Sequence, residues 1–64
     1  MKMNRPLRAK IVERFGTQAD FAHIIRATEP VISRVVRGRK ELPPEQQERW
    51  ARALGATVEE IFQQ

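Results

Sequence analysis

The segment TEPVISRVVRG, residues 28–38, presents two different faces when it is placed on a helix. At about 3.6 residues per turn, one side carries Val31, Ile32, Val35 and Val36, and the other carries Glu29, Pro30, Ser33, Arg34 and Arg37. Valine and isoleucine lose side-chain freedom in a helix, so burial has to hold this one. The pattern predicts a helix over 28–37 with one face in a core and the other turned outward.

Both ends of this helix are marked as well. Thr28 is expected to cap its start with the side-chain oxygen. Pro30 is tolerated in the first turn, where an N–H has no partner within the helix. Gly38 can end the helix in a left-handed conformation.

The other helices are marked by the same kind of signal. Apolar periodicity predicts helices over about 5–15, from the cap Thr17 to about 25, within PPEQQERWARALG (residues 43–55), and over about 58–62. Asn4 and Thr17 are candidate caps, and Thr57 with Glu60 has the spacing of a capping box. Alternation with period two is not sustained anywhere. The sequence predicts an all-α fold, a compact five-helix cluster forming one domain over 1–64.

Size and composition narrow the class of protein. A chain of 64 residues without cysteine has neither a disulfide framework nor a thiolate metal site, and this fits a reducing cytosol. Apolar runs fall far short of the roughly 20 residues of a membrane helix, and MKMNRPLRAK lacks the apolar block of a signal peptide. We expect a soluble, cytoplasmic protein that does not contact a membrane.

Charge is unevenly distributed along the chain. Residues 1–40 carry ten Lys and Arg against three Asp and Glu, a net +7, whereas residues 41–64 carry two against five, a net −3. A basic front, together with a sequence pI near 10.7, favours an anionic partner, with nucleic acid as the first candidate. A merely solubilising basic surface is the alternative.

The unit from Gln18 to Arg37 contains two short helices with almost no loop between them. Ala22 provides the small side chain that close crossing of two helices requires, and apolar residues at Phe21, Ile25, Ile32 and Val35 can fill the angle. This is the pattern of a helix-turn-helix. TQADFAHIIRATEPVISRVVRG, followed by WARALGATVEEIF, closely resembles the lambda-repressor-like family of phage repressors, Cro proteins and Xre-type regulators, over roughly residues 7–62.

The resemblance implies double-stranded DNA as the partner and a role for particular residues. Base edges would be reached by Glu29, Pro30, Ser33 and Arg34, and phosphates by Gln18, Arg37, Arg39 and Lys40. This chain departs from the family at Arg26, where glycine is usual, and a non-glycine residue at positive φ costs on the order of 1 kcal/mol. It also departs at Ile24, where a polar residue is usual, so an apolar side chain is expected to be exposed.

Each proposed contact has an ordinary alternative. Arg34 can bond guanine O6 and N7 together, or it can be solvated or bind a phosphate. Glu29 can accept from cytosine N4, although an acidic residue at a helix start is also favoured by the helix dipole. Pro30 offers only apolar contact to a thymine methyl, and Ser33 specifies little alone. The basic residues near the start of the chain are expected to be solvated; these are Lys2, Arg5, Arg8 and Lys10. The alternative is that they add to the positive electrostatic field or reach a groove of DNA as an arm.

Other chemistry is not expected. His23 is the only histidine and lies on the outer side of its helix, so neither metal binding nor catalysis is indicated. Trp50, four residues before Leu54, is expected in the core. We expect no enzyme activity, no cofactor, no metal and no small-molecule ligand.

One such unit contacts few base pairs, so a homodimer is expected, with Val58 and Phe62 as candidate interface residues. The expected function is that of a Cro-like or Xre-type repressor, phage or prophage encoded, on the nucleoid of a bacterial or phage-infected cell. The alternative is a protein-interaction module such as an antitoxin, which would bind its partner through Ile24 and the acidic part of the chain, residues 41–64. Single-stranded RNA binding is not favoured, because it uses exposed aromatic side chains on which bases stack, and this sequence lacks such platforms.

Overall fold

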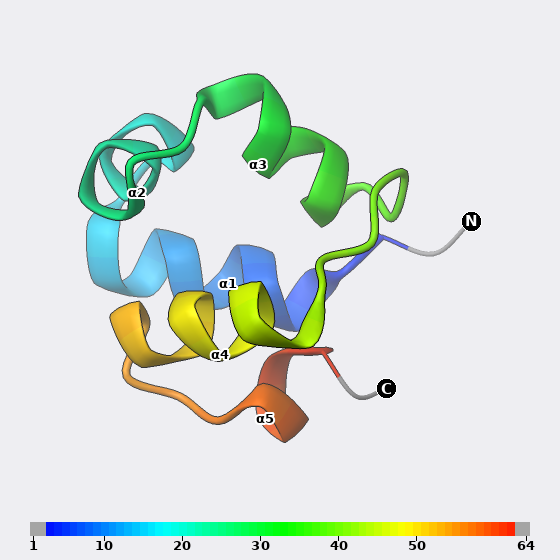
Figure 1. The fold of residues 1–64 in the computed structure, drawn as a ribbon. Helices are drawn as coiled ribbons and strands as arrows, with labels where there is room; N and C mark the ends of the chain where they lie inside the picture. Colours follow the sequence, from blue (N-terminus) through cyan, green and yellow to red (C-terminus); the bar gives the residue numbers. More distant parts are fainter. Residues whose placement is uncertain (1–2, 63–64) are drawn as a thin grey trace.

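The computed structural model describes residues 3–62, which fold into helices joined by short turns. The helices are α1 (Arg5–Phe15), α2 (Gln18–Ile25), α3 (Glu29–Val36), α4 (Pro44–Ala53) and α5 (Val58–Phe62) (Figure 1). The all-α class is therefore confirmed, and the part of the chain that the structure describes contains no strand. In this same part, no helix has the length and apolar character needed to span a membrane.

Three of the predicted caps are present as hydrogen bonds. The side chain of Asn4 accepts from the backbone N–H of Leu7 at 3.1 Å, and Thr17 Oγ1 accepts from the N–H of Asp20 at 3.1 Å. The capping box at α5 is reciprocal, since the Glu60 N–H donates to Thr57 Oγ1 at 3.2 Å and the Thr57 N–H donates to Glu60 Oε1 at 3.3 Å. Capping therefore explains why α1, α2 and α5 begin where they do.

The predicted cap at α3 is wrong in its chemistry. Thr28 does occupy the N-cap position, but its side chain makes no capping hydrogen bond. An N-cap oxygen normally accepts from the second or third residue of the helix, and the second residue here is Pro30, which has no N–H. α1 also has proline, Pro6, at its second position and is nevertheless capped through the N–H of its third residue, Leu7, so the proline alone does not explain the missing bond at α3.

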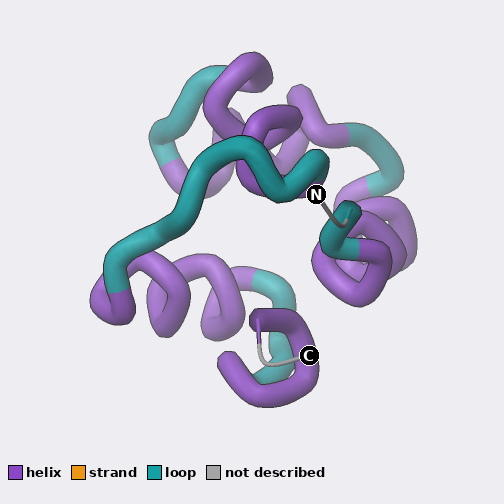
Figure 2. Tube along the Cα trace, turned by 90° about the vertical axis from the view of Figure 1, so that its right-hand side faces the viewer, coloured by secondary structure: helices purple, strands orange, loops and turns teal. Residues whose placement is uncertain are grey.

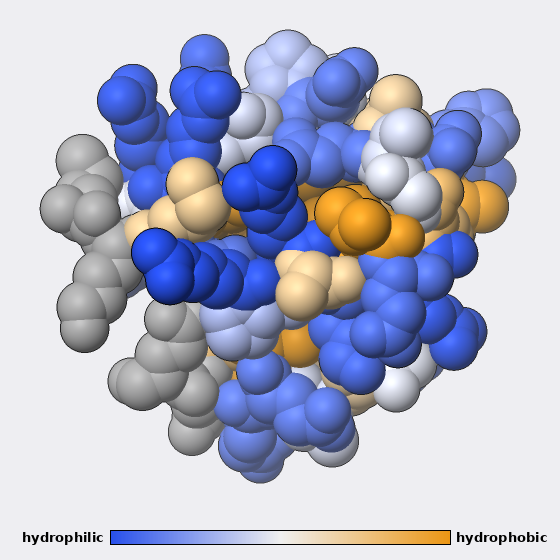
Figure 3. Space-filling model, turned by 180° about the vertical axis from the view of Figure 1, so that it is seen from behind, coloured by the Kyte–Doolittle hydropathy of each residue, from blue (hydrophilic) through white to orange (hydrophobic). Residues whose placement is uncertain are grey.

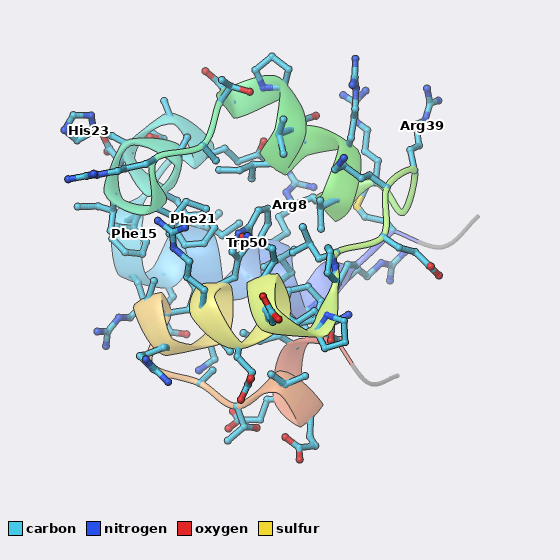
Figure 4. The ribbon with its side chains drawn as sticks, in the orientation of Figure 1. Arg8, Phe15, Phe21, His23, Arg39 and Trp50 are labelled. Atoms are coloured by element: carbon cyan, nitrogen blue, oxygen red, sulfur yellow. The ribbon has the colours of Figure 1, made fainter. Side chains whose placement is uncertain are left out.

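The core lies where all five helices meet, and Phe21 of α2 is at its centre. The Phe21 ring packs against Phe15 with a centroid separation of 5.3 Å and edge-on against Trp50 at 5.4 Å. Figure 4 shows these three rings converging from α1, α2 and α4. Trp50 is 2% exposed, which confirms it as a core residue. The buried residues are Leu7, Ile11, Phe21, Ala22, Ile25, Ile32, Val35, Val36, Leu42, Trp50, Ala51, Leu54 and Ile61.

Burial on α3 follows the predicted apolar face with one exception. Ile32, Val35 and Val36 are buried, but Val31 is only partly buried and lies outside the core. At its end, α3 is joined to the start of α1, because the Asn4 N–H donates to the Val36 carbonyl at 2.6 Å. Gly38 then takes the left-handed conformation, φ 76°, as predicted. The segment 37–43 runs from here along one side of the molecule to α4 (Figure 2).

Residues 26–28 form the turn between α2 and α3. Arg26 stands where glycine would be easiest, and it nevertheless adopts the left-handed conformation, with φ 58° and ψ 41°. The end of α2 has a second support, since Arg49 Nη2 of α4 donates to the Ile25 carbonyl at 2.9 Å. A cation at a helix C-terminus is favoured by the helix dipole and satisfies one of its free carbonyls. Arg26 therefore takes the left-handed conformation at the end of α2 despite its Cβ.

Replacement of Arg26 tests the strain in this turn. Glycine adopts φ 58° without a Cβ clash, whereas alanine keeps the clash and removes only the rest of the side chain. We expect Arg26→Gly to have a free energy of unfolding about 1 kcal/mol above that of Arg26→Ala, after the larger entropy of glycine in the unfolded chain is included. Urea unfolding followed by circular dichroism measures the difference, and a less stable glycine variant would contradict it.

Candidate nucleic-acid interface

The outward face of α3 carries the side chains that the sequence placed there. Glu29, Pro30, Arg34 and Arg37 are exposed, and Ser33 is half-buried. The opposite face holds Ile32, Val35 and Val36 in the core. Burial of this apolar face fixes the orientation of the helix, so the polar face cannot turn inward without exposing three aliphatic side chains.

A depression of about 490 Å³ runs beside this face, between α1, α2 and α3. It is lined by Met3, Arg8, Gln18, Glu29, Pro30, Ser33, Val36 and Arg37. Five of the predicted contact residues therefore lie together, although they come from two helices and the residue after one of them. Arg34, Arg39 and Lys40 do not line it. A polar helix face next to a hollow with guanidinium groups is a surface suited to an elongated anionic partner.

Two further residues line this depression: Met3, which the sequence did not single out, and Arg8, which was expected to be solvated, with a groove-binding arm as the alternative. Arg8 extends from α1 toward α3 (Figure 4), one helical turn after Asn4, whose N–H bonds to the end of α3. The sequence does contain a signal, because Arg8 lies three residues before the buried Ile11 and therefore at the edge of the buried face of α1. The sequence alone does not indicate that α3 lies along this edge.

Two of the predicted phosphate contacts, Arg39 and Lys40, follow the end of α3. Arg39 points away from the body of the molecule (Figure 4), and Lys40 is also exposed. Gln18 is half-buried at the first position of α2. Arg39 and Lys40 therefore lie beyond the end of α3, whereas Gln18 lines the depression together with residues expected to reach bases.

Few of the cations are neutralised within the molecule. Among residues 3–62 the one ion pair joins Lys10 and Glu13 at 3.9 Å, on the exposed surface of α1. Arg8, Arg34 and Arg37 are exposed and make no ion pair with the carboxylates of these residues. Their positive charges are therefore directed to solvent, where they attract anions over a distance of about 10 Å at 0.1 M salt.

Other residues singled out from the sequence lie away from this face. His23 points outward from α2 (Figure 4), and Ile24 is 58% exposed, as expected for an apolar side chain at this position. Val58 and Phe62 are half-buried and pack against the core, with the Phe62 ring 6.5 Å from Trp50. No group of His, Asp or Glu side chains in residues 3–62 has an arrangement that could hold a metal ion.

The molecule seen from behind is mainly hydrophilic, with a small apolar area between charged side chains (Figure 3). Ala9 and Val12 of α1, together with Met3 just before it, line an open depression with Arg5, Arg8 and Glu13, and Val12 is 55% exposed. This depression shares Met3 and Arg8 with the one beside α3.

Comparisons with protein-family models, with curated proteins and with solved structures gave no match. The interface is therefore interpreted from its own geometry and charge. That geometry consists of an outward polar face on a buried helix, a neighbouring depression with two arginines, and cations beyond the helix end.

Proposed function

We propose that the chain is a sequence-specific protein of the helix-turn-helix class that binds double-stranded DNA. In this proposal α2 and α3 are the helix-turn-helix unit, and α3 enters the major groove. The observation that carries it is the exposed face of α3, which ends in cations while its opposite face is buried. A helix about 10–12 Å across fits a major groove about 12 Å wide, where every base pair presents a distinct pattern.

More particularly, we propose a Cro-like or Xre-type repressor of the lambda-repressor-like family, acting in the cytoplasm on the nucleoid. The support is the resemblance of residues 7–62 to that family, together with the three-residue turn and the left-handed Arg26 at the position where the family has glycine. This three-residue turn keeps α3 in a fixed orientation relative to α2. We propose no catalytic role for any residue.

The proposed contacts divide into two kinds. Arg34 reads a base through its two-pronged guanidinium group, with Glu29, Pro30 and Ser33 at the neighbouring edges. Gln18, Arg37, Arg39 and Lys40 hold phosphates, which fixes the position of α3 without carrying sequence information. The two kinds differ in what their loss does to binding, and this makes them separable by experiment.

A homodimer follows from the size of the domain. Its largest extent is 24 Å, whereas half-sites on one face of DNA lie about 34 Å apart, so one copy cannot read both. We propose that α5 forms the two-fold contact through the exposed parts of Val58 and Phe62. Both side chains also pack against the core, so their replacement requires a folding control.

The decisive experiment is selection of bound duplexes from a random pool, followed by titration of the selected and a scrambled duplex at several salt concentrations. We expect the selected duplex to bind at least a thousandfold more tightly than the scrambled one. Binding of the two should weaken with salt along nearly parallel slopes, since the phosphate contacts are shared. Equal affinity for both duplexes, even at low salt, would remove the proposal.

Arg34→Ala tests base recognition. We expect the variant to lose its preference at one base position, at a cost of about 1–3 kcal/mol for the preferred base and little for the others. Binding of a panel of single-base variants of the selected duplex measures this. Arg37→Ala is the matched control and should weaken all members of the panel equally. A uniform loss with Arg34→Ala would instead place Arg34 among the phosphate contacts.

An interaction module such as an antitoxin remains the second candidate. The observation in its favour is the exposure of Ile24 on α2, 58%, at a position where a DNA-binding unit has no use for an apolar side chain. In this case the partner would be a protein, and binding to DNA would be secondary. If the duplex experiment selects no sequence, this function is favoured over the first.

A further inference from the structure

Arg8 and Arg37 share one end of the depression beside α3. Arg37 directly follows α3, and the Asn4 N–H bonds to the carbonyl of the residue before it, Val36. Arg8 lies one turn further along α1, with its own N–H bonded to the Asn4 carbonyl at 3.2 Å. The backbone thus holds the start of α1 against the end of α3, and both arginines line the hollow between them.

The charges at this end are not balanced by the protein. Neither arginine forms an ion pair with a described carboxylate. Glu29 lines the same depression, but it lies eight residues before Arg37, which is about 12 Å along α3 at about 1.5 Å per residue. Both arginines therefore line one hollow, and the acidic residue that also lines it, Glu29, lies at the far end of the helix. An anion placed between the two arginines would relieve their mutual repulsion.

We propose that Arg8 and Arg37 together bind one phosphate group of the DNA backbone at this end of the depression. The inference rests on the proposed function and adds to it a binding residue on α1. A guanidinium fork bonds two phosphate oxygens at once, so two forks from different helices can hold a single phosphate from two sides. Arg8 thus belongs to the interface, and α1 takes part in fixing α3 in the groove.

The test uses the full chain and a short labelled duplex of mixed sequence, titrated over a series of salt concentrations. Because the shared phosphate needs both guanidinium groups, we expect Arg8→Gln to lose it, to weaken binding about eightfold at 0.1 M salt and to flatten the salt dependence by about one unit. The matched control is Arg14→Gln, which removes the same charge from the same helix but at a site beside Gly55. Arg14→Gln should leave the slope nearly unchanged. Equal slopes for the two variants would overturn the proposal.

A double-variant cycle tests whether the two arginines share a phosphate. We expect the double variant Arg8→Gln, Arg37→Gln to bind more than threefold more tightly than the product of the two single losses of affinity predicts. The losses of affinity caused by Arg14→Gln and Arg37→Gln should multiply. Additive effects of Arg8→Gln and Arg37→Gln would show that they hold separate phosphates and would overturn the inference. Thermal melts of all variants verify that each is folded.

Binding of the wild-type protein to the duplex distinguishes failure of this inference from failure of the proposed function. If wild-type protein does not bind the duplex at low salt, the proposed function fails and the inference fails with it. The remaining source of phosphate is then tested with inorganic phosphate, by following the Nε–Hε signals of Arg8 and Arg37 against chloride at equal ionic strength. Shifts of both signals without duplex binding would reassign the pair to a free phosphate ion.

Discussion

Phe21→Ala is expected to lower the free energy of unfolding by about 3–5 kcal/mol at 25 °C. Phe21 is fully buried at the centre of the core, where its ring contacts Phe15 and Trp50. Loss of a buried phenylalanine costs about 3–5 kcal/mol, because apolar contacts are lost and a cavity remains. A domain of this size has a total stability of roughly 3–10 kcal/mol, at about 0.05–0.15 kcal/mol per residue. The substitution therefore removes a large share of it.

Chemical unfolding followed by Trp50 fluorescence and by far-ultraviolet circular dichroism measures this loss. Ile24→Ala is the matched control, since it removes a large apolar side chain from the same helix at an exposed site. We expect the control to change stability by less than about 0.5 kcal/mol. Similar effects of the two substitutions would mean that α2 does not bury Phe21 in the way described.

The triple variant Arg37→Gln, Arg39→Gln, Lys40→Gln is expected to show the largest loss of DNA binding. All three side chains are exposed at or after the end of α3, and none forms an ion pair within residues 3–62. If each neutralises one phosphate, the salt slope falls by about three units and the affinity at 0.1 M salt falls about 500-fold. The preference among base sequences should persist, because phosphate contacts carry no sequence information.

Filter binding or fluorescence anisotropy over a salt series measures both quantities. The double variant Arg14→Gln, Arg52→Gln removes cations from α1 and α4 at positions outside the depression beside α3, and it should reduce the slope much less per charge. If the triple variant loses base preference while keeping its slope, these residues recognise bases and the assignment of roles is wrong.

Much of the fold could be predicted because its helix boundaries are set locally. Asn4, Thr17 and Thr57 each accept from an N–H group three positions ahead, and such signals are complete within a few residues of sequence. The cap expected at Thr28 is absent, and the local sequence did not reveal this, because Asn4 caps α1 with a proline at the same helix position.

The parts that could not be predicted depend on which helices are neighbours. The outward face of α3 follows from the spacing of its own residues, but the depression beside it exists only because α1 lies along α3. Periodicity assigns Arg8 to the margin of α1 and does not tell which helix faces that margin. In the same way, the cost of a positive φ at Arg26 could be inferred from the sequence, but the support from Arg49 of α4 was not visible in the local sequence.

The hydrogen bond from Arg49 to the Ile25 carbonyl also has a practical consequence. It joins residues far apart in the chain, so the end of α2 acquires this support only after α4 has docked. A synthetic peptide covering α2 and α3 alone would lack both the bond and the aromatic contact of Trp50 with Phe21. Such a minimal fragment is a poor substitute for the intact domain, and efforts to shorten or graft the unit should carry α4 along.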